Sequence, residues 1–234
     1  ALPIWAEHAL VNVSLEVAPG EFFCLLGPSG CGKSTLLNIM AGFQKPTGGE
    51  VVIEGEKITQ PHAEYISVFQ NYGLLPWRNV WDNVCLGLEI AGLSVQEQKE
   101  RAQEYIDLVG LGGSEKKSMS ELSGGMQQRV AIARALATKP KVLFMDEPFG
   151  ALDEMTRLKL GRELLRIWEH EKVTIVFVTH NIDDAIALGD RIGVMGEAPG
   201  RIKEIIPVTL SRQRDTTTPE ASALRKKILG LFGV

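Results

Sequence analysis

Gly27-Pro-Ser-Gly-Cys-Gly-Lys-Ser34 is the stretch that decides the fold of this chain. It fits the pattern G-x-x-x-x-G-K-[ST], in which glycines let the backbone curl so that successive N–H groups point at phosphate oxygens. The apolar run Glu21–Leu26 precedes it, and a helix is expected from Lys33 to about Ala41. The positive end of that helix would add to the phosphate cradle. The stretch therefore predicts a strand, a phosphate loop and a helix in an α/β fold.

Each residue of the loop has an expected part in holding a nucleotide. Lys33 would reach the β- and γ-phosphates, and the Ser34 hydroxyl would bind Mg²⁺. A chance glycine-rich turn is the alternative, but a turn between a strand and a helix has the context that phosphate binding requires. The residues that we expect to contact the nucleotide are Gly27, Pro28, Ser29, Gly30, Cys31, Gly32, Lys33, Ser34 and Thr35.

Polar residues follow two further predicted strands. Asp146-Glu147 comes after Lys141–Met145, and His180 comes after Val173–Thr179. Ligands of open α/β sheets bind outside the carboxyl ends of strands. Asp146 therefore suits the surroundings of Mg²⁺, Glu147 can orient or deprotonate a water, and His180 can contact the γ-phosphate. Taken singly, the acidic pair could be a helix cap and the histidine structural, but beside a phosphate loop they indicate catalysis.

Leu122-Ser-Gly-Gly-Met-Gln-Gln-Arg129 opens a long predicted helix. Ser123 is a good N-cap, and Gly124 and Gly125 leave the backbone bare beside it. An ordinary capped helix is one interpretation, and a second phosphate-binding surface is the other. The stretch lies in 74–129, where strand-like runs vanish and which we interpret as an inserted helical subdomain. Two such surfaces that cannot easily meet within one chain suggest that they meet across a dimer.

The rest of the chain predicts a mainly parallel sheet with a small antiparallel β part. One catalytic core is expected over 1–73 and 130–206, and a short C-terminal tail over 207–234. The tail ends in a basic amphipathic helix, which either packs on its own domain or contacts a membrane surface. The strands expected are 21–26, 50–54, 65–69, 141–145 and 173–179, with a closing pair at 191–195 and 200–206. The main helices expected are 33–41, 96–110, 123–138 and 156–170.

Composition excludes several partners and sites. The chain has 234 residues and a formal net charge of -4, so no basic excess is available to hold a nucleic-acid backbone. Its three cysteines are scattered, which indicates reduced thiols rather than a zinc site. No apolar run approaches the roughly 20 residues that cross a bilayer, and the first eight residues do not resemble a signal peptide. We expect a soluble, intracellular protein that reaches any membrane through partners.

Taken together, the motifs resemble those of ABC transporter nucleotide-binding domains. In chain order they are the phosphate loop (Walker A), Gln70 after a strand, Leu-Ser-Gly-Gly at 122–125 (the signature), Asp146-Glu147 at the end of Walker B, Ala151-Leu-Asp153, and His180. The resemblance covers nearly the whole chain, and the signature string is much more specific than Walker A alone. It implies a P-loop NTPase fold with a RecA-like core, and an enzyme that hydrolyses MgATP.

The resemblance also implies a head-to-tail dimer that sandwiches two MgATP. Each nucleotide would lie between one Walker A and the partner's signature helix, so that Ser123, Gly124 and Gly125 would serve the partner's site. Gln70 would sense Mg²⁺ and the attacking water, and Asp153 would link the two sites. The expected catalytic residues are then Glu147, His180 and Gln70, and the expected Mg²⁺ residues are Ser34, Gln70 and Asp146.

Trp5 falls roughly where the family places an aromatic residue that stacks on adenine, and stacking needs only a π-face. The first strand that usually precedes this residue is missing from the sequence. The tail after Pro207 is too short for the extra regulatory domain of maltose-type subunits, so we expect no such regulation.

Within the family, Phe69–Trp77 and Asp146–Asp153 look most like importers of nitrate, sulfonate, taurine and related small anions, and Ala198-Pro-Gly-Arg-Ile202 supports that placement. The segment after Gln70 would receive a coupling helix from a membrane subunit. The implied partners are an identical or paralogous ATPase subunit, transmembrane permease subunits, and a periplasmic or lipid-anchored solute-binding protein reached through the complex. The chain would be peripheral, at the cytoplasmic face of the inner membrane.

Two other classes of protein share these motifs. The motor of an exporter or lipid-extraction system has every catalytic motif, and only the importer-like stretches argue against it. A DNA-repair or chromosome ATPase usually has a long coiled coil or a zinc insert before the signature, and this sequence has neither a sustained heptad run nor a cysteine cluster. A GTPase is disfavoured because no N-K-x-D motif is present.

Overall fold

The structure, a computed structural model, describes residues 8–150, 152–212, 214 and 216–233. The chain forms two compact units. Unit 1 comprises 1–61 and 176–234, and unit 2 comprises 62–175. The division into a catalytic core and an insert at 74–129 stays a prediction.

Unit 1 is built on parallel and antiparallel strand pairs. Strand β1 (Phe22–Leu26) pairs in parallel with β7 (Arg191–Met195), and β7 pairs antiparallel with β8 (Ile202–Pro207). All five residues of β1 are buried, as a continuous apolar run predicts for a strand covered on both faces. A separate antiparallel pair consists of β2 (Val52–Ile53) and β3 (Glu56–Lys57). The predicted mixture of parallel strands with a small antiparallel part is confirmed.

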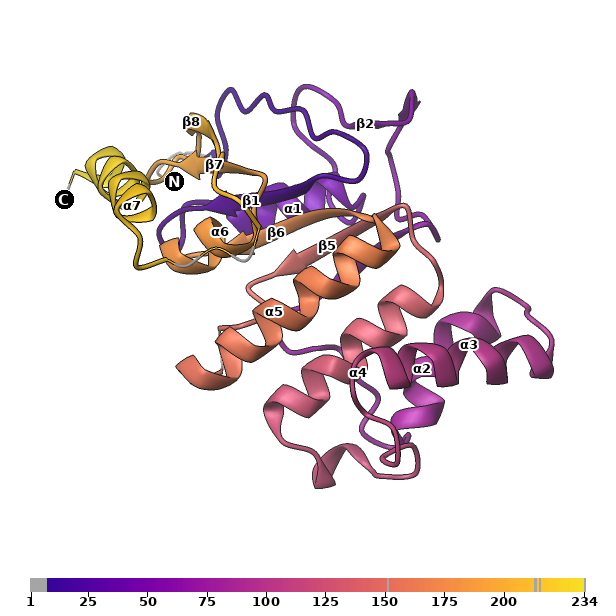
Figure 1. Cartoon of the computed structure of the whole chain (residues 1–234). Helices are drawn as coiled ribbons and strands as arrows, with labels where there is room; N and C mark the ends of the chain where they lie inside the picture. The colour runs from indigo at the N-terminus through magenta and orange to yellow at the C-terminus, as the bar shows by residue number, and fades with distance from the viewer. Residues whose placement is uncertain (1–7, 151, 213, 215, 234) are drawn as a thin grey trace, which may run out of the picture. The chain divides into compact units, whose positions relative to one another are not determined.

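The described residues of unit 1 form three helices: α1 (Lys33–Met40), α6 (Ile182–Leu188) and α7 (Pro219–Phe232). Helix α6 packs on β1, and α7 packs on α6 (Figure 1). Ala221 and Ile228 of α7 are buried. The tail helix therefore packs on its own unit, as one of the two interpretations of the sequence expected.

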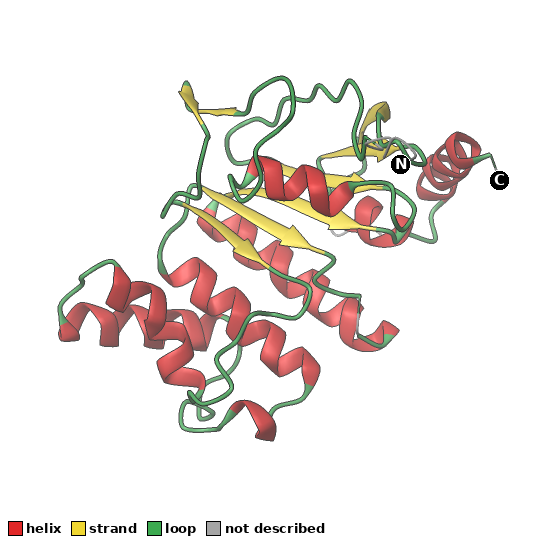
Figure 2. Cartoon of the chain, turned by 180° about the vertical axis from the view of Figure 1, so that it is seen from behind, coloured by secondary structure: helices red, strands yellow, loops and turns green. Residues whose placement is uncertain are grey.

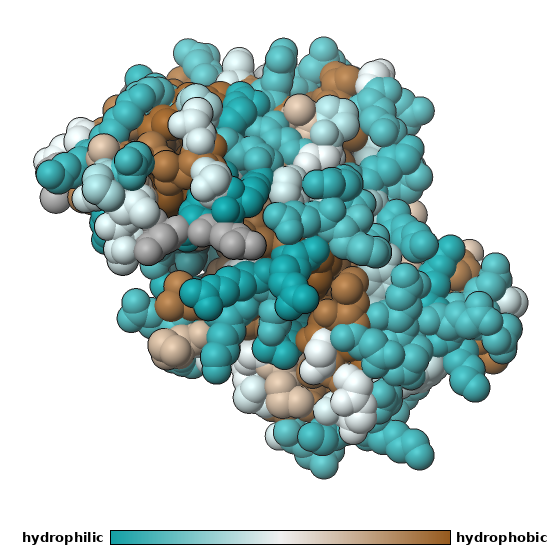
Figure 3. Space-filling model, viewed as in Figure 1, coloured by the Kyte–Doolittle hydropathy of each residue, from teal (hydrophilic) through white to brown (hydrophobic). Residues whose placement is uncertain are grey.

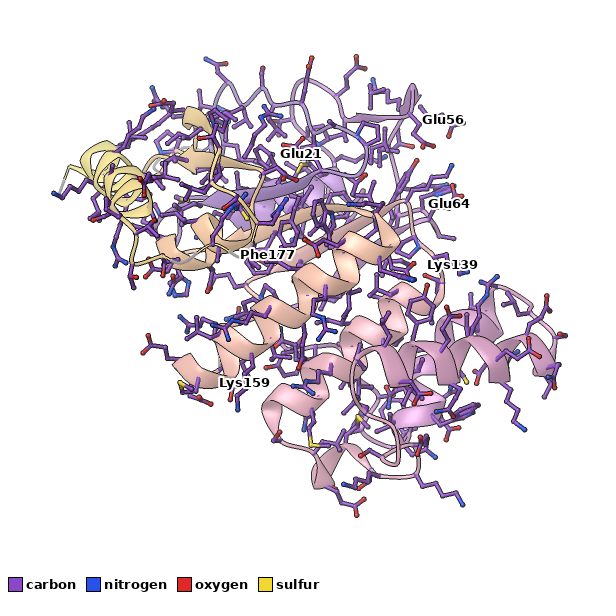
Figure 4. All side chains as sticks on the ribbon, viewed as in Figure 1. Glu21, Glu56, Glu64, Lys139, Lys159 and Phe177 are labelled. Carbon is purple, nitrogen blue, oxygen red and sulfur yellow. The ribbon has the colours of Figure 1, made fainter. Side chains whose placement is uncertain are left out.

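Strand β6 (Thr174–Thr179) begins in unit 2 and ends in unit 1. Within unit 1, the ring of Phe177, labelled in Figure 4, lies 5.8 Å from the ring of Phe22 on β1. Both side chains are completely buried. This aromatic contact forms part of the core from which the phosphate loop emerges.

Unit 2 contains, in the part that the structure describes, a parallel strand pair and four α-helices. Strand β4 (Tyr65–Val68) pairs with β5 (Val142–Asp146). The helices are α2 (Val80–Ile90), α3 (Val95–Leu108), α4 (Gly124–Ala137) and α5 (Glu154–Glu171), and a short 3-10 turn, η1, covers Met119–Glu121. Helices α2, α3 and α4 pack against one another (Figure 2). The α/β fold class predicted from the sequence is confirmed.

Local sequence explains where the helices of unit 2 begin. Helix α3 starts with a capping box, in which Ser94 and Glu97 each bond the other's backbone N–H. It buries Ala102, Tyr105 and Ile106, and apart from Val95 and Leu108 its exposed residues are mostly polar, so that its surface is largely hydrophilic (Figure 3). No helix in the described residues is long and apolar enough to span a bilayer.

Candidate functional site

The phosphate loop of unit 1 encloses its own lysine. Lys33 is only 4% exposed, and its Nζ donates to the carbonyl oxygens of Gly27 at 2.9 Å and Pro28 at 2.8 Å. A buried ammonium is costly unless it is hydrogen-bonded, so these carbonyls hold the charge inside the curl of the loop. The backbone is thus arranged around a fixed positive charge, as a phosphate site requires.

The start of α1 differs from every other α-helix start in the described residues. Its N-cap is Gly32, at φ 97°, and makes no side-chain cap hydrogen bond. The other six helices all begin with a side chain that accepts from the first turn, namely Asn79, Ser94, Ser123, Asp153, Asn181 and Thr218. A helix start with no capping side chain leaves its positive dipole end suited to an external anion.

The loop also has room on its outer side. Gly30 has φ 78°, a conformation that glycine adopts without strain, and a Cβ built there would meet no atom within 4 Å. Lys33, the bare start of α1 and this open backbone together fit the phosphates of a nucleoside triphosphate. The residues predicted from Gly27 to Thr35 therefore run continuously from the end of β1 into the first turn of α1.

His180 also lies in unit 1, directly after β6 and exposed. The next residue, Asn181, caps α6 by accepting from the N–H groups of Asp183 and Asp184. Its own N–H donates to Thr179 Oγ1 at 3.0 Å. These bonds fix the backbone on the carboxyl side of His180, at the strand end where the sequence predicted it.

In unit 2, the acidic pair lies at the carboxyl end of β5, as predicted. Asp146 is the last residue of that strand, and Glu147 has φ 44°. A left-handed conformation is uncommon for a residue other than glycine, and such strain is concentrated at functional sites. The turn is closed by the Gly150 N–H, which donates to the Glu147 carbonyl at 3.0 Å.

Gln70 and Glu147 are brought together in unit 2. The parallel register pairs Val68 with Met145, so β4 and β5 end at the same edge. A Cβ added to Gly150 would lie 3.6 Å from Gln70 Nε2 and 3.9 Å from Glu147 Cβ. Because Gly150 has no side chain, the space between these two predicted catalytic residues stays open. Sequence reasoning did not single out Gly150, although it stands inside the quoted Asp146–Asp153 stretch.

The signature residues form the capped start of α4. Ser123 Oγ accepts from the Met126 N–H at 3.3 Å, and both Ser123 and Gly124 are exposed. Packing favours glycine at position 125, because a Cβ there would lie 2.9 Å from Thr156 Cγ2 on α5. At Gly124 the nearest atoms would be 3.9 Å away. The two glycines are therefore not equivalent.

Asp153 is the N-cap of α5. It accepts from the Thr156 N–H at 3.0 Å and from the Thr156 hydroxyl at 2.7 Å. The Thr156 side-chain bond, followed by the backbone bond, lowers the pKa of this carboxyl. The capping role is visible in the structure, and the expected link between nucleotide sites stays a prediction. Trp5, expected at the adenine, lies outside the described residues.

Residues 10–150 match the ABC transporter family. An uncharacterised ABC transporter ATP-binding protein of Methanocaldococcus jannaschii is 52% identical over 96% of this chain and 84% of that protein. The aliphatic sulfonates import ATP-binding protein of Bacillus subtilis is 46% identical over 95% and 86%, and the nitrate import ATP-binding protein of Synechococcus elongatus is 47% identical over 88% and 77%.

Solved structures agree with the family match. A dimeric ATP-binding cassette in a post-hydrolysis state, bound to ADP and Pi, is 36% identical with a TM-score of 0.76, over 87% of this chain and 92% of that one. The structure of cbiO1 from Clostridium perfringens, part of an ABC transporter complex, has a TM-score of 0.80 at 26% identity, over 94% of this chain and 86% of that one. The fold and motifs define a P-loop ATPase of the cassette type. The chain belongs to the ABC transporter family, as an ATP-binding and ATP-hydrolysing subunit with import subunits among its relatives.

Proposed function

We propose that this chain is the ATPase subunit of an ABC importer that takes up a small anion of the nitrate or sulfonate type. The observation that carries the proposal is the 46–47% identity to sulfonate and nitrate import subunits, over more than three quarters of both chains. The solute itself would be recognised by other subunits, because the motifs of this chain concern nucleotide alone.

The roles of the site residues follow from their chemistry. Lys33 and the loop N–H groups would bind the β- and γ-phosphates, and Glu147 would take a proton from the attacking water. His180 would contact the γ-phosphate, and Gln70 would orient the water. Bound Mg²⁺ would neutralise phosphate charge; it favours phosphate oxygens with one or two protein oxygens, and Ser34, Asp146 and Gln70 offer such ligands.

Dimerisation would complete each site. The signature residues Ser123 and Gly124 are exposed at the start of α4, where another subunit's nucleotide could reach the helix terminus. A two-fold axis would create two equivalent sites at once. The related cassette that is dimeric in its solved structure supports this arrangement.

Membrane subunits would dock on unit 2. Trp77, in the segment after Gln70, is 77% exposed, which is unusual for so large an apolar side chain. We assign it to the contact with a coupling helix of the permease, at the cytoplasmic face of the membrane. A solute-binding protein would join through the permease.

The test of the ATPase role is Glu147→Gln. It should retain ATP binding, lose about 10²- to 10⁴-fold in turnover and accumulate as an ATP-bound dimer. ATP turnover near the parental rate in this variant would show that Glu147 is not the general base.

The test of the transport role is purification of the tagged protein from its native membranes, followed by mass spectrometry and uptake assays of the reconstituted complex. Recovery of a multi-spanning permease with a solute-binding protein, and uptake of nitrate or a sulfonate that Lys33→Ala abolishes, is expected. A permease without a binding protein would favour an exporter. Recovery of a homodimer alone would contradict transport.

A further inference from the structure

The segment Ala198-Pro-Gly-Arg-Ile202 follows β7 and is joined to the beginning of the described chain. The Gly200 N–H donates to the Ala9 carbonyl, and the Val11 N–H donates to the Gly200 carbonyl, both at 2.9 Å. Leu10 and Gly200 thereby form a parallel bridge. The Gly196 N–H, which donates to the Arg201 carbonyl at 2.9 Å, closes the turn. Gly200 is thus pinned on both sides by backbone hydrogen bonds.

Gly200 lies directly against the backbone of the phosphate loop. A Cβ built on Gly200 would be 2.0 Å from the carbonyl oxygen of Cys31 and 2.8 Å from Met195 Cε. Cys31 and Met195 are almost completely buried, at 1% and 0% exposure. No side chain other than hydrogen fits at position 200 while the loop keeps its place.

Leu10 fills the space beside Gly200 under the same loop. Its Cδ2 is 2.8 Å from the Cβ position of Gly32 and 3.1 Å from that of Gly200. The Ala9 carbonyl oxygen is 2.9 Å from the Gly32 Cβ position. Two glycines, one on the loop and one on the distant turn, therefore allow Leu10 and the Cys31 peptide to pack closely.

We propose that Gly200 and Leu10 are positioning residues that form a floor beneath the phosphate loop and set where its N–H groups meet the nucleotide phosphates. The proposal rests on the proposed phosphate-binding role of residues 27–34. It gives the Ala198–Ile202 segment a function at the phosphate loop, in addition to its resemblance to the anion importers.

The expected effect follows from distances. An oxygen and a Cβ do not approach within 3.0 Å, so the contact of 2.0 Å at Gly200 would force the Cys31 peptide to move by about 1 Å. The turn cannot yield easily because both of its backbone groups are held by Ala9 and Val11. Misplacement on this scale costs up to about 100-fold in reactions that depend on positioning.

The experiment compares Gly200→Ala and Leu10→Ala with the parent and with Gly48→Ala. Gly48 lies in unit 1, and a Cβ added there meets nothing within 4 Å, so this variant is the matched control. The affinity for ATP is titrated with EDTA present to stop hydrolysis, and KM and kcat are measured with Mg²⁺. We expect about tenfold weaker ATP binding and a raised KM in both test variants, and parental values in Gly48→Ala.

The split between KM and kcat distinguishes positioning from general destabilisation. A smaller folded fraction lowers the apparent kcat and leaves KM unchanged, whereas a displaced loop raises KM. If Gly200→Ala does not fold, Leu10→Ala decides the question, because it removes the packing without adding a clash. Parental KM and affinity in folded Leu10→Ala and Gly200→Ala would overturn the inference.

Lys33→Ala separates this inference from the proposed function. If Lys33→Ala binds ATP weakly while the floor variants bind normally, only the floor is wrong. If Lys33→Ala itself binds ATP with parental affinity, the loop is not the phosphate site and the proposed function fails with it.

Discussion

The phosphate loop and the signature segment are both glycine-containing helix starts, yet their N-caps differ. At α1 the N-cap is Gly32, with no side-chain cap, and a buried lysine stands inside the loop. At α4 the N-cap is Ser123, whose hydroxyl already accepts from the helix's first turn. The first region is shaped for an external anion, and the second is a satisfied helix terminus within its own chain.

Glycine has two distinct uses in these motifs: it leaves backbone open in the loop, and it allows close packing between helices. Gly30 adopts a positive φ and leaves the backbone of the loop open on its outer side. Gly125 instead lets α4 approach Thr156 of α5. The signature glycine at 125 therefore has a packing function in this chain, whatever it does for a second subunit.

The largest effect is expected when the positive charge of Lys33 is removed from the phosphate loop, and it tests the comparison of the two helix starts. Lys33→Ala should weaken ATP binding by about 10- to 100-fold, since charge-assisted hydrogen bonds contribute about 1.5–3 kcal/mol. Ser123→Ala should leave ATP binding to the isolated subunit unchanged. Calorimetric titration of dilute protein with ATP and EDTA checks both. Equal losses in the two variants would show that the two helix starts serve one site within one chain.

The next effect concerns packing at Gly125. Gly125→Ala places a methyl group 2.9 Å from Thr156 Cγ2 and should cost about 1–3 kcal/mol of unfolding free energy. Gly124→Ala, with neighbours at 3.9 Å and beyond, should be neutral or slightly stabilising. Urea denaturation measures the difference. Thr156→Ser removes the clashing methyl and should restore Gly125→Ala; absence of rescue would contradict the packing explanation.

A smaller effect is expected at the cap of α4. Ser123→Ala removes the acceptor of the Met126 N–H and should lower the unfolding free energy by about 1 kcal/mol. Ser123→Asn retains an acceptor and is the matched control. The thermal midpoints of the three proteins provide the measurement, and an unchanged midpoint in Ser123→Ala would mean that solvent replaces the cap without cost.

The smallest effect is the pH dependence due to Asp153. Hydrogen bonds from Thr156 lower its pKa below the ordinary 3.8, so the folded state favours the ionised carboxylate. Its stabilisation is present above the unfolded-state pKa and is lost as the pH falls through the lower, folded-state pKa. Thermal midpoints measured from about pH 5 to about pH 3 should fall less steeply in Asp153→Asn, which still caps α5. Identical slopes would show that the charge contributes nothing.

Most of the regular elements could be predicted because their causes are local. The apolar run at Val142–Asp146 and the period of Val95–Leu108 identified a strand and a helix to within two residues. Helices α2 (Val80–Ile90) and α6 (Ile182–Leu188) were not predicted. Each begins at an asparagine N-cap, Asn79 or Asn181, whose side chain accepts hydrogen bonds from the first turn. The asparagine itself is the sequence signal that could have located these two helix starts.

The sequence was enough to predict the family, the order of the motifs and the residue types expected to bind and hydrolyse ATP, because spacing within a strand–loop–helix unit is local information. Tertiary structure alone decided which distant residues the motifs contact. Gly200 lies against Cys31, and Gly125 lies against Thr156, since a missing Cβ matters only where another segment approaches. No pattern along the chain encodes such an approach, because it depends on how separate strands and helices pack.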